Sequence, residues 1–177
     1  ADDRITTTSN GVQPSLTLGG LRLTGEYRRE TTYGPRYTDI SIVNTSGVQT
    51  SATREPGESM PHATRDVLAG GGFYGITWKH LRLESGLRYD WLHSRADSTP
   101  QSFTPELNVT DRRLSAEAGF SRAFGAVTPY GRVATGFRAP NLEERYFNDD
   151  IHGGLRLFGN PDLLAERTGT VEVGVRT

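Results

Sequence analysis

The stretch LRLESGLRYDWLH, at residues 81–93, alternates between apolar and polar side chains over most of its length. A period of two places successive side chains on opposite faces of a β-strand. One face then carries Leu81, Leu83, Leu87, Tyr89 and Trp91, and the other carries Arg82, Glu84, Gly86, Arg88 and Asp90. The stretch therefore predicts a strand with one apolar face and one charged face.

Two features of this stretch favour a strand in a membrane over a strand in a soluble sheet. Tyr89 and Trp91 lie together near one end, as in the aromatic girdle at a membrane interface. Charges continue along the whole opposite face, as a water-filled lumen allows. The run also reaches the length of about 9–11 residues with which a strand crosses the hydrocarbon layer.

The same alternation recurs along the chain and predicts about seven strands. We expect them at residues 4–18, 20–32, 67–79, 81–93, 112–124, 129–138 and 169–177. A small additional hairpin, residues 40–44 and 48–53, is expected inside the first long connection.

The connections alternate between short and long. Tight turns are expected at residues 19–20, 79–80 and 125–128, and long polar segments at 32–66, 94–111 and 139–168. Outer-membrane barrels have short periplasmic turns and long extracellular loops, whereas the loops of a soluble sandwich are mostly short. The predicted fold class is an all-β, antiparallel transmembrane β-barrel.

An odd number of strands indicates that residues 1–177 form only part of a barrel. Bacterial single-chain barrels have even strand numbers, and an open sheet would leave unpaired backbone groups in lipid. We therefore expect a partial barrel wall of about seven strands with long extracellular loops.

Composition excludes several other classes of protein. No apolar run reaches the roughly 18 residues of a membrane helix, and a mean hydropathy of −0.55 suits strands that expose only alternate residues to lipid. A net charge of −1 does not indicate nucleic-acid binding. The absence of cysteine rules out disulfides and thiolate metal sites. No nucleophile motif or zinc-protease motif is present, so we expect neither enzymatic activity nor a cofactor.

Residues 128–177 contain a series of motifs typical of one family. GFRAP occupies residues 136–140, GNPDL occupies 159–163, and VEVG occupies 171–174. In this order and spacing they resemble the barrel of TonB-dependent outer-membrane receptors. The chain departs from the usual family pattern at Leu164 and Ala165, where the family has Lys or Pro.

This resemblance implies a location and a function. Residues 1–177 would be a barrel segment, with the plug domain, the TonB-contacting segment and the end of the barrel outside them. The protein would lie in the bacterial outer membrane, among its lipids and lipopolysaccharide. It would take part in TonB-coupled uptake of a scarce nutrient, preferably a ferric siderophore or haem, with cobalamin as a further cargo of the family.

The motifs also have a direct physical interpretation. Pro140 lacks a backbone donor and should end the preceding strand. The sequence Asn-Pro-Asp at residues 160–162 favours a turn. Arg138 and Glu166 could then pair at the rim of the lumen. On this interpretation the motifs shape the base of a loop, and they indicate family membership more than ligand contact.

The third long segment supplies the candidate ligand-binding residues. They are Arg138, Arg145, Tyr146, Phe147, His152, Arg156 and Phe158. Arginines attract an anionic ferric chelate, aromatic rings line an apolar surface, and His152 could ligate haem iron. The alternative for His152 is a solvated loop histidine. Asp149, Asp150 and His152 are weak candidates for a metal site, since EF-hand spacing is absent.

Two alternatives from other classes remain open at this point. A passive porin or structural barrel would show the same alternation without a plug. A soluble β-sandwich binding module would pack the face of Leu81, Leu83 and Leu87 inside the protein. The solvent that meets this apolar face distinguishes the sandwich from both barrels.

Overall fold

The computed structural model describes residues 2–97, 107–151 and 155–177. Its strands are β1 (Asp2–Asp3), β2 (Thr6–Val12), β3 (Ser15–Leu18), β4 (Leu21–Val43), β5 (Gln49–Trp78), β6 (Leu81–Ala96), β7 (Leu107–Arg122), β8 (Thr128–Arg138), β9 (Asn148–Ile151), β10 (Leu155–Phe158) and β11 (Glu166–Arg176). A single short helix, α1 (Leu142–Tyr146), follows β8 in the described part. No helix within these ranges is long and apolar enough to span a membrane.

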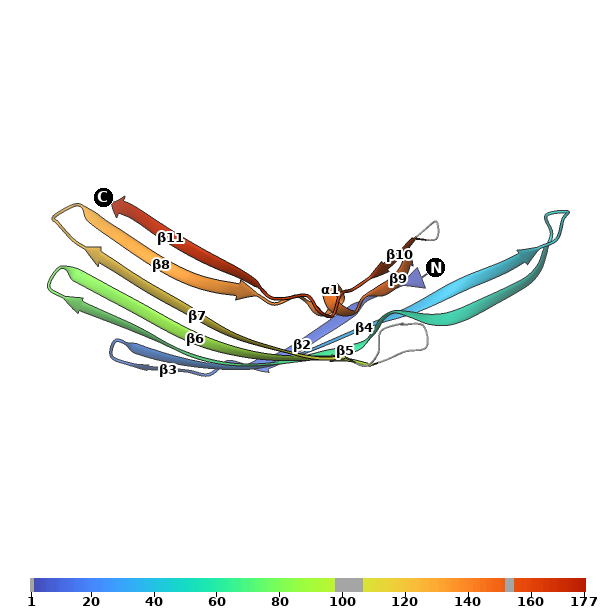
Figure 1. The fold of residues 1–177 in the computed structure, drawn as a ribbon, viewed down its shortest axis with the longest axis horizontal. Helices are drawn as coiled ribbons and strands as arrows, with labels where there is room; N and C mark the ends of the chain where they lie inside the picture. Colours follow the sequence, from blue (N-terminus) through green and yellow to red (C-terminus); the bar gives the residue numbers. More distant parts are fainter. Residues whose placement is uncertain (1, 98–106, 152–154) are drawn as a thin grey trace.

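Nine of the strands form one antiparallel sheet in the order β1-β4-β5-β6-β7-β8-β11. β1, β2 and β3 follow one another along β4. They fill one position, so the described sheet has seven positions, and the prediction of about seven strands is confirmed. The sheet is open and curved, with α1 and the β9–β10 hairpin on its concave side (Figure 1).

The two ends of the sheet differ as the sequence predicts. At one end, which we call the turn end, tight turns join neighbouring strands. Gly19, Lys79 and Gly125 adopt positive φ angles of 58°, 53° and 61° in these turns, and left-handed residues of this kind allow two strands to reverse within a few residues. The opposite end, which carries the longer connections, is called the loop end.

The first long connection differs from the prediction. Residues 32–66 were expected to be mainly a polar loop, but β4 and β5 continue through them as one long hairpin. The expected turn around Ser46 and Gly47 is confirmed. Irregular pairing between Thr32 and Gly34 interrupts the register. The prediction was wrong because it took the polar side chains of this segment as the sign of a loop. Two strands of a hairpin in water can pair through their backbones without an apolar face.

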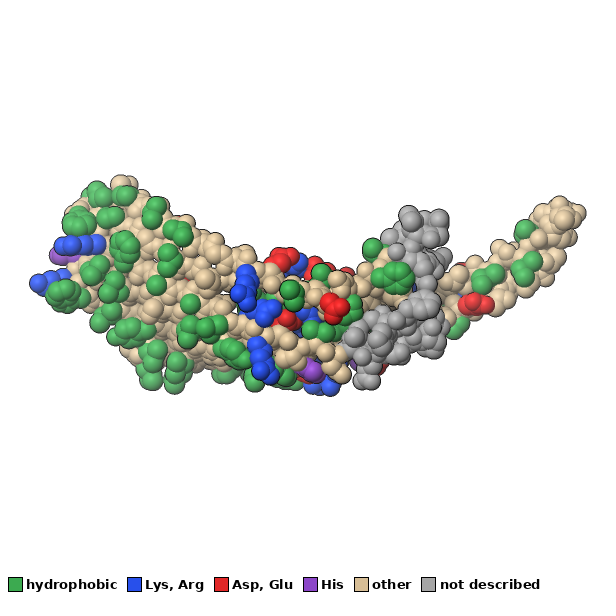
Figure 2. Space-filling view, viewed as in Figure 1, with side chains coloured by type: hydrophobic (Ala, Val, Ile, Leu, Met, Phe, Trp, Pro, Cys, Tyr) green, Lys and Arg blue, Asp and Glu red, His purple; other side chains and the backbone are tan. Residues whose placement is uncertain are grey.

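The side chains show an inverted distribution across the sheet. We call the convex face the outward face and the concave face the inner face. Leu83 and Leu87 on the outward face are 46% and 54% exposed, whereas Asp90 on the inner face is only 5% exposed. Apolar side chains gather over the part of the molecule nearest the turn end (Figure 2). This distribution is the reverse of a soluble sheet and matches a wall between lipid and a polar lumen.

Inner-face charges compensate one another. Arg88 donates to Glu26 of β4 at 2.6 Å and to Asp90 at 2.9 Å. Arg132 of β8 pairs with Glu117 of β7. Arg132 and Glu117 lie on neighbouring strands, whereas Arg88 reaches Glu26 across β5. Opposite charges that share a face of the sheet stabilise it. The polar face is therefore a connected array of ion pairs rather than a row of isolated charges.

The wall divides between β7 and β8 towards the loop end. Their paired residues end at Glu117 and Ala134. Beyond that point β7 remains paired with β6 as far as Leu107, and β8 remains paired with β11 as far as Arg138. The two strands visibly diverge in Figure 1. We call this divergence the β7–β8 split.

Candidate ligand-binding site

The GFRAP motif leads directly into α1 at the loop end. Asn141 caps the helix, since its Oδ1 atom accepts a hydrogen bond from the backbone N–H of Glu144 at 2.6 Å. The Glu144 carboxylate accepts a bond from the Asn141 N–H at 2.7 Å. This reciprocal pair is a capping box, which satisfies backbone donors that a helix start leaves free. Pro140 precedes it and ends the pairing of β8, as predicted.

One side of α1 packs against the inner face of the sheet. Leu142 and Tyr146 are 4% and 1% exposed and belong to an apolar cluster with Met60, Ala63 and Ala96. Ala63 and Ala96 are register partners on β5 and β6. Their small side chains leave room for the helix to approach the wall. The insert formed by α1, β9 and β10 therefore lies inside the curve of the sheet.

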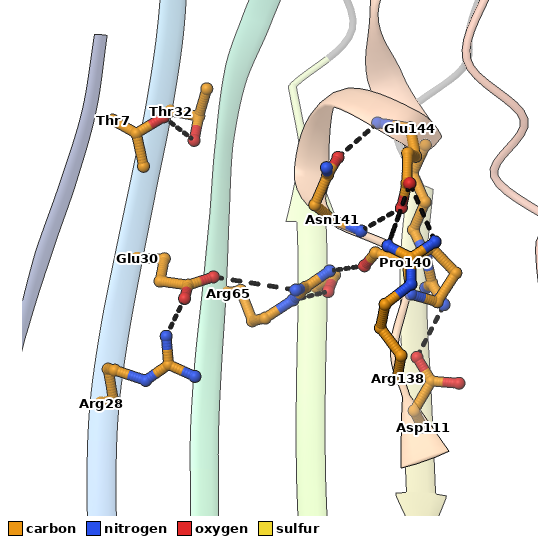
Figure 3. A network of polar contacts seen from close by, with 12 residues as sticks. Thr7, Arg28, Glu30, Thr32, Arg65, Asp111, Arg138, Pro140, Asn141 and Glu144 are labelled. Carbon is orange, nitrogen blue, oxygen red and sulfur yellow. Dashed lines mark hydrogen bonds and ion pairs between the residues drawn. The ribbon is translucent and has the colours of Figure 1, made fainter. Parts of the chain in front are cut away.

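Two buried arginines, Arg65 and Arg145, bind the insert to the wall. Figure 3 shows Arg65 beside Pro140. Arg145 of α1 is fully buried and donates to Asp111 of β7 at 2.7 Å. Arg65 of β5 donates to Ser94 at 3.0 Å and to the carbonyl oxygen of Pro140. Because guanidinium groups present several donors in a rigid plane, each arginine can hold more than one strand. They fix the start and the end of α1 to different parts of the wall.

A third arginine ties the insert to β11. Arg138 donates to both Glu144 and Glu166, with N–O distances of 3.0 Å. The predicted pair of Arg138 and Glu166 is confirmed. The Asn141 N–H and the Arg138 guanidinium hold the pKa of the Glu144 carboxyl below its ordinary value. Glu144 thus stabilises α1 as an anion.

The side of α1 that faces away from the wall forms a hollow of about 440 Å³. Its lining residues are Glu143, Glu144, Phe147, Leu157, Phe158, Gly159, Asn160 and Leu163. The apolar members are open to solvent, since Leu157, Phe158 and Leu163 are 51%, 52% and 38% exposed. We call this the loop-end hollow. Because the opposite side of α1 lies against the inner face, the hollow opens towards the interior of the curve.

The hollow is held in shape by the return of the chain from β10. The Gly159 N–H donates to the carbonyl of Phe147 at 2.6 Å, and the Asn160 N–H donates to that of Glu144 at 2.9 Å. The Asn160 side chain accepts a bond from the Asp162 N–H at 3.0 Å. The turn predicted for this segment is thereby confirmed.

The structure separates the predicted ligand-binding residues into distinct groups. Phe147 and Phe158 line the loop-end hollow. Arg138 lies beside it, with its guanidinium engaged by two carboxylates. Arg145 and Tyr146 lie beneath α1, against the wall. In this conformation the last two face away from any ligand in the hollow.

The remaining candidates fall in or near the β9–β10 hairpin. His152 lies outside the described residues. The backbones of Asp149, Asp150 and Arg156 belong to the hairpin, with Asp150 paired to Arg156, and their side chains lie outside the described part of the structure. In the portion of the chain with described side chains, no three His, Asp or Glu residues are grouped as a metal site. The metal site therefore stays a prediction.

Sequence reasoning missed four residues that matter at this site. Leu157 and Leu163 line the hollow, and Arg65 and Asp111 anchor the insert. A leucine beside Phe158 in a polar segment was an available signal for an exposed apolar surface. The two anchors had no local signal, because their partners are 75 and 34 residues away.

The fold and this site define the class of the protein. A curved antiparallel sheet with an apolar outward face, a charged inner face and a folded insert at its loop end is a wall of a transmembrane β-barrel. A sequence model of the family described as "TonB dependent receptor-like, beta-barrel" matches residues 1–177, and the chain belongs to this family. None of the curated proteins matches the chain. Proteins of this family serve TonB-coupled transport in the outer membrane and are not enzymes.

Proposed function

We propose that this chain forms part of the wall of an outer-membrane receptor that takes up a ferric siderophore or haem with energy supplied through TonB. The loop-end hollow carries this proposal. It places exposed Phe158, Leu157 and Leu163 on the side of α1 that faces the lumen. Exposed apolar side chains in a wet lumen are unfavourable unless a ligand covers them. In the proposed receptor, the loop end of the wall faces the outside of the cell.

The chemistry of the hollow favours a bulky, partly aromatic ligand. Its volume of about 440 Å³ falls in the ordinary range for small-molecule sites, roughly 300–1,000 Å³. Phe147 and Phe158 offer rings for stacking on catecholate or porphyrin groups. Arg138 and Arg145 already pair with carboxylates, so a negative charge on the ligand would be met by other residues, with Arg156 as the proposed one.

Further parts of the proposal concern residues beyond the described site. His152 is proposed as an axial ligand if the cargo is haem, and Asp149 and Asp150 as weak candidates for a metal. We also propose that residues 1–177 are one segment of a larger barrel. A plug domain and a TonB-contacting segment elsewhere in the protein would complete the receptor.

The two alternatives fare differently. A β-sandwich needs a second sheet over the apolar face, and no such sheet covers the outward face in the described ranges. A passive porin would have the same kind of wall, but it binds no ligand that would cover an exposed apolar hollow at the loop end. Ligand binding therefore separates the receptor from the porin.

The test uses the full-length protein, purified in detergent and titrated with haem, ferric siderophores and cobalamin while tryptophan fluorescence is recorded. We expect saturable binding of an iron chelate or haem. The variant Phe158→Ala should weaken it roughly tenfold, in keeping with about 0.5–1.5 kcal/mol for one stacking partner plus the buried area.

The matched control is Phe120→Ala. Phe120 is 53% exposed and Phe158 is 52% exposed, but Phe120 lies on the outward face of β7. Its removal should leave the affinity unchanged. Equal affinity of Phe158→Ala and the wild type would remove the hollow from the binding site. A complete lack of binding by the wild type to all three cargo classes would favour the porin.

A further inference from the structure

The loop-end hollow has an uneven distribution of charge. Its described lining residues include two carboxylates, those of Glu143 and Glu144, and neither a lysine nor an arginine. The other lining residues are apolar or carry no charge, namely Phe147, Leu157, Phe158, Gly159, Asn160 and Leu163. An open site lined by charges of one sign attracts ligands of the opposite sign. The hollow itself therefore favours a cation over an anion.

The arginine beside the hollow does not reverse this balance. All three nitrogen atoms of the Arg138 guanidinium donate to carboxylates. Nη1 lies 3.0 Å from a Glu144 oxygen, and Nη2 and Nε lie 3.0 and 3.3 Å from the Glu166 oxygens. One cation thus faces two carboxylates even before Glu143 is included, so its charge is more than balanced by its own partners.

The second arginine of this segment, Arg145, lies on the other side of α1. Its side chain is completely buried against the wall and pairs with Asp111 at 2.7 Å. The helix separates this charge from a ligand in the hollow. An anionic ligand would therefore depend on residues outside the described lining, such as Arg156.

Glu143 is the carboxylate that remains for a ligand. It is exposed, and within the described ranges its side chain takes part in no ion pair or hydrogen bond. Glu144, by contrast, accepts bonds from the Asn141 N–H at 2.7 Å and from Arg138. An unpaired carboxylate beside apolar side chains attracts a cation more strongly than one surrounded by water, because the local dielectric constant is lower.

The aromatic rings of the hollow favour the same sign of charge. Phe147 and Phe158 line it together with Glu143. The face of an aromatic ring carries a negative potential and attracts an ammonium group. One carboxylate and two rings around a single hollow therefore suit an alkylammonium group better than a phosphate or a carboxylate.

We propose that the loop-end hollow selects a cationic iron chelate, in which hydroxamate groups hold the iron and an alkylammonium group lies beside Glu143. This inference rests on the proposed function, which makes the hollow the cargo site, and it narrows the class of cargo. Hydroxamates carry one negative charge each and together neutralise ferric iron, so an amine on the same ligand leaves a positive charge. Catecholates carry two each and leave the complex anionic, and the carboxylates of haem are anionic as well.

The experiment compares three ferric chelates on the full-length protein in detergent, with tryptophan fluorescence as the signal. They are a linear trihydroxamate with a free terminal amine, the same trihydroxamate with its amine acetylated, and a tricatecholate. We expect the amine-bearing chelate to bind about fivefold more tightly than its acetylated form, which is the effect of one solvent-exposed ion pair. The tricatecholate should bind most weakly.

The variant Glu143→Gln tests whether this carboxylate is responsible. It should give the amine-bearing and acetylated chelates equal affinity, and the acetylated chelate should stay within about twofold of its wild-type affinity. The comparison variant is Glu55→Gln. Glu55 is an exposed glutamate of the β4–β5 hairpin and lies outside the lining of the hollow, so the preference for the amine should persist. Thermal unfolding checks that both variants are folded.

Three results would overturn the proposal while the proposed function stands. They are equal wild-type affinity for the amine-bearing and acetylated chelates, tighter binding of the tricatecholate or of haem, and a preference for the amine that survives in Glu143→Gln. In each case the protein still binds an iron-containing cargo. A lack of binding to all three chelates and to haem would overturn the proposed function itself, and the selectivity with it.

Discussion

The Nη2 atom of Arg145 in α1 lies 2.7 Å from the Oδ2 atom of Asp111 in β7. The arginine side chain is completely buried, and the aspartate side chain is 8% exposed. Asp111 belongs to the part of β7 that has no pairing with β8. The ion pair therefore connects the insert after β8 to β7 across the β7–β8 split, where backbone hydrogen bonds are missing.

The variant Asp111→Asn tests how much this ion pair contributes to the stability of the protein. It should destabilise the protein by about 3–5 kcal/mol, because it leaves a buried guanidinium without its counter-charge. The double variant Asp111→Asn/Arg145→Met should recover most of the loss, since neither position then carries a buried charge. Thermal unfolding in detergent measures both effects.

The control for this prediction is Glu84→Gln. Glu84 pairs with Arg82 on the inner face, where the side chains are 37% and 57% exposed. An exposed pair contributes only about 0–1 kcal/mol. A similar loss for Asp111→Asn and Glu84→Gln would contradict a structural role for the buried pair.

Removing the Thr135 hydroxyl should weaken the wall at the split. Thr135→Val leaves the Ala116 N–H without its acceptor, at a cost of about 1–3 kcal/mol for a buried unsatisfied group. Hydrogen exchange at the Ala116 amide should accelerate in lipid nanodiscs. Thr135→Ser keeps the hydroxyl, and exchange as fast as in the valine variant would show that the hydroxyl is not the cause.

The shape of the loop-end hollow should depend on Gly159. A Cβ atom at this position would come within 2.5–2.6 Å of the backbone of Arg145 and Tyr146, and backbone cannot move aside as a side chain can. Gly159→Ala should push the chain away from α1, with a cost of about 1–3 kcal/mol and weaker cargo binding. Gly169→Ala, where space is open, is the matched control. Unchanged cargo affinity in Gly159→Ala would indicate that the hollow does not contact cargo.

Acid should loosen α1. Hydrogen bonding from Asn141 and the charge of Arg138 lower the pKa of Glu144 in the folded protein. A lowered folded pKa gives stability that is complete above the ordinary glutamate value of about 4.3 and is lost as the pH falls through the folded pKa. Amide exchange in α1 should therefore accelerate below about pH 4.3.

The variant Glu144→Gln provides the comparison for this pH effect. It should accelerate α1 exchange already at pH 7 and remove most of the acid response. Glu143→Gln, one residue earlier in the same helix, should retain that response. An acid response that persists fully in Glu144→Gln would assign it to another group.

Much of the wall could be predicted from the sequence. The alternation in residues 81–93 assigned Leu83 and Leu87 to a face that the structure shows as exposed and outward. Three tight turns, the pair of Arg138 with Glu166 and the turn at Asn160 were also predicted correctly. The turns are local. Arg138 and Glu166 are 28 residues apart, but they lie at the facing ends of two strands that are consecutive in the predicted wall, so their pairing could be expected.

Other features required the tertiary structure. The sequence placed Arg145 and Tyr146 among loop residues, whereas the fold turns α1 so that both lie against the wall. It gave no indication of the β7–β8 split. A period of two determines which side of a strand a residue occupies. Only the packing of distant segments determines whether that side meets lipid, a ligand or another part of the protein, because such contacts depend on residues far apart in the chain.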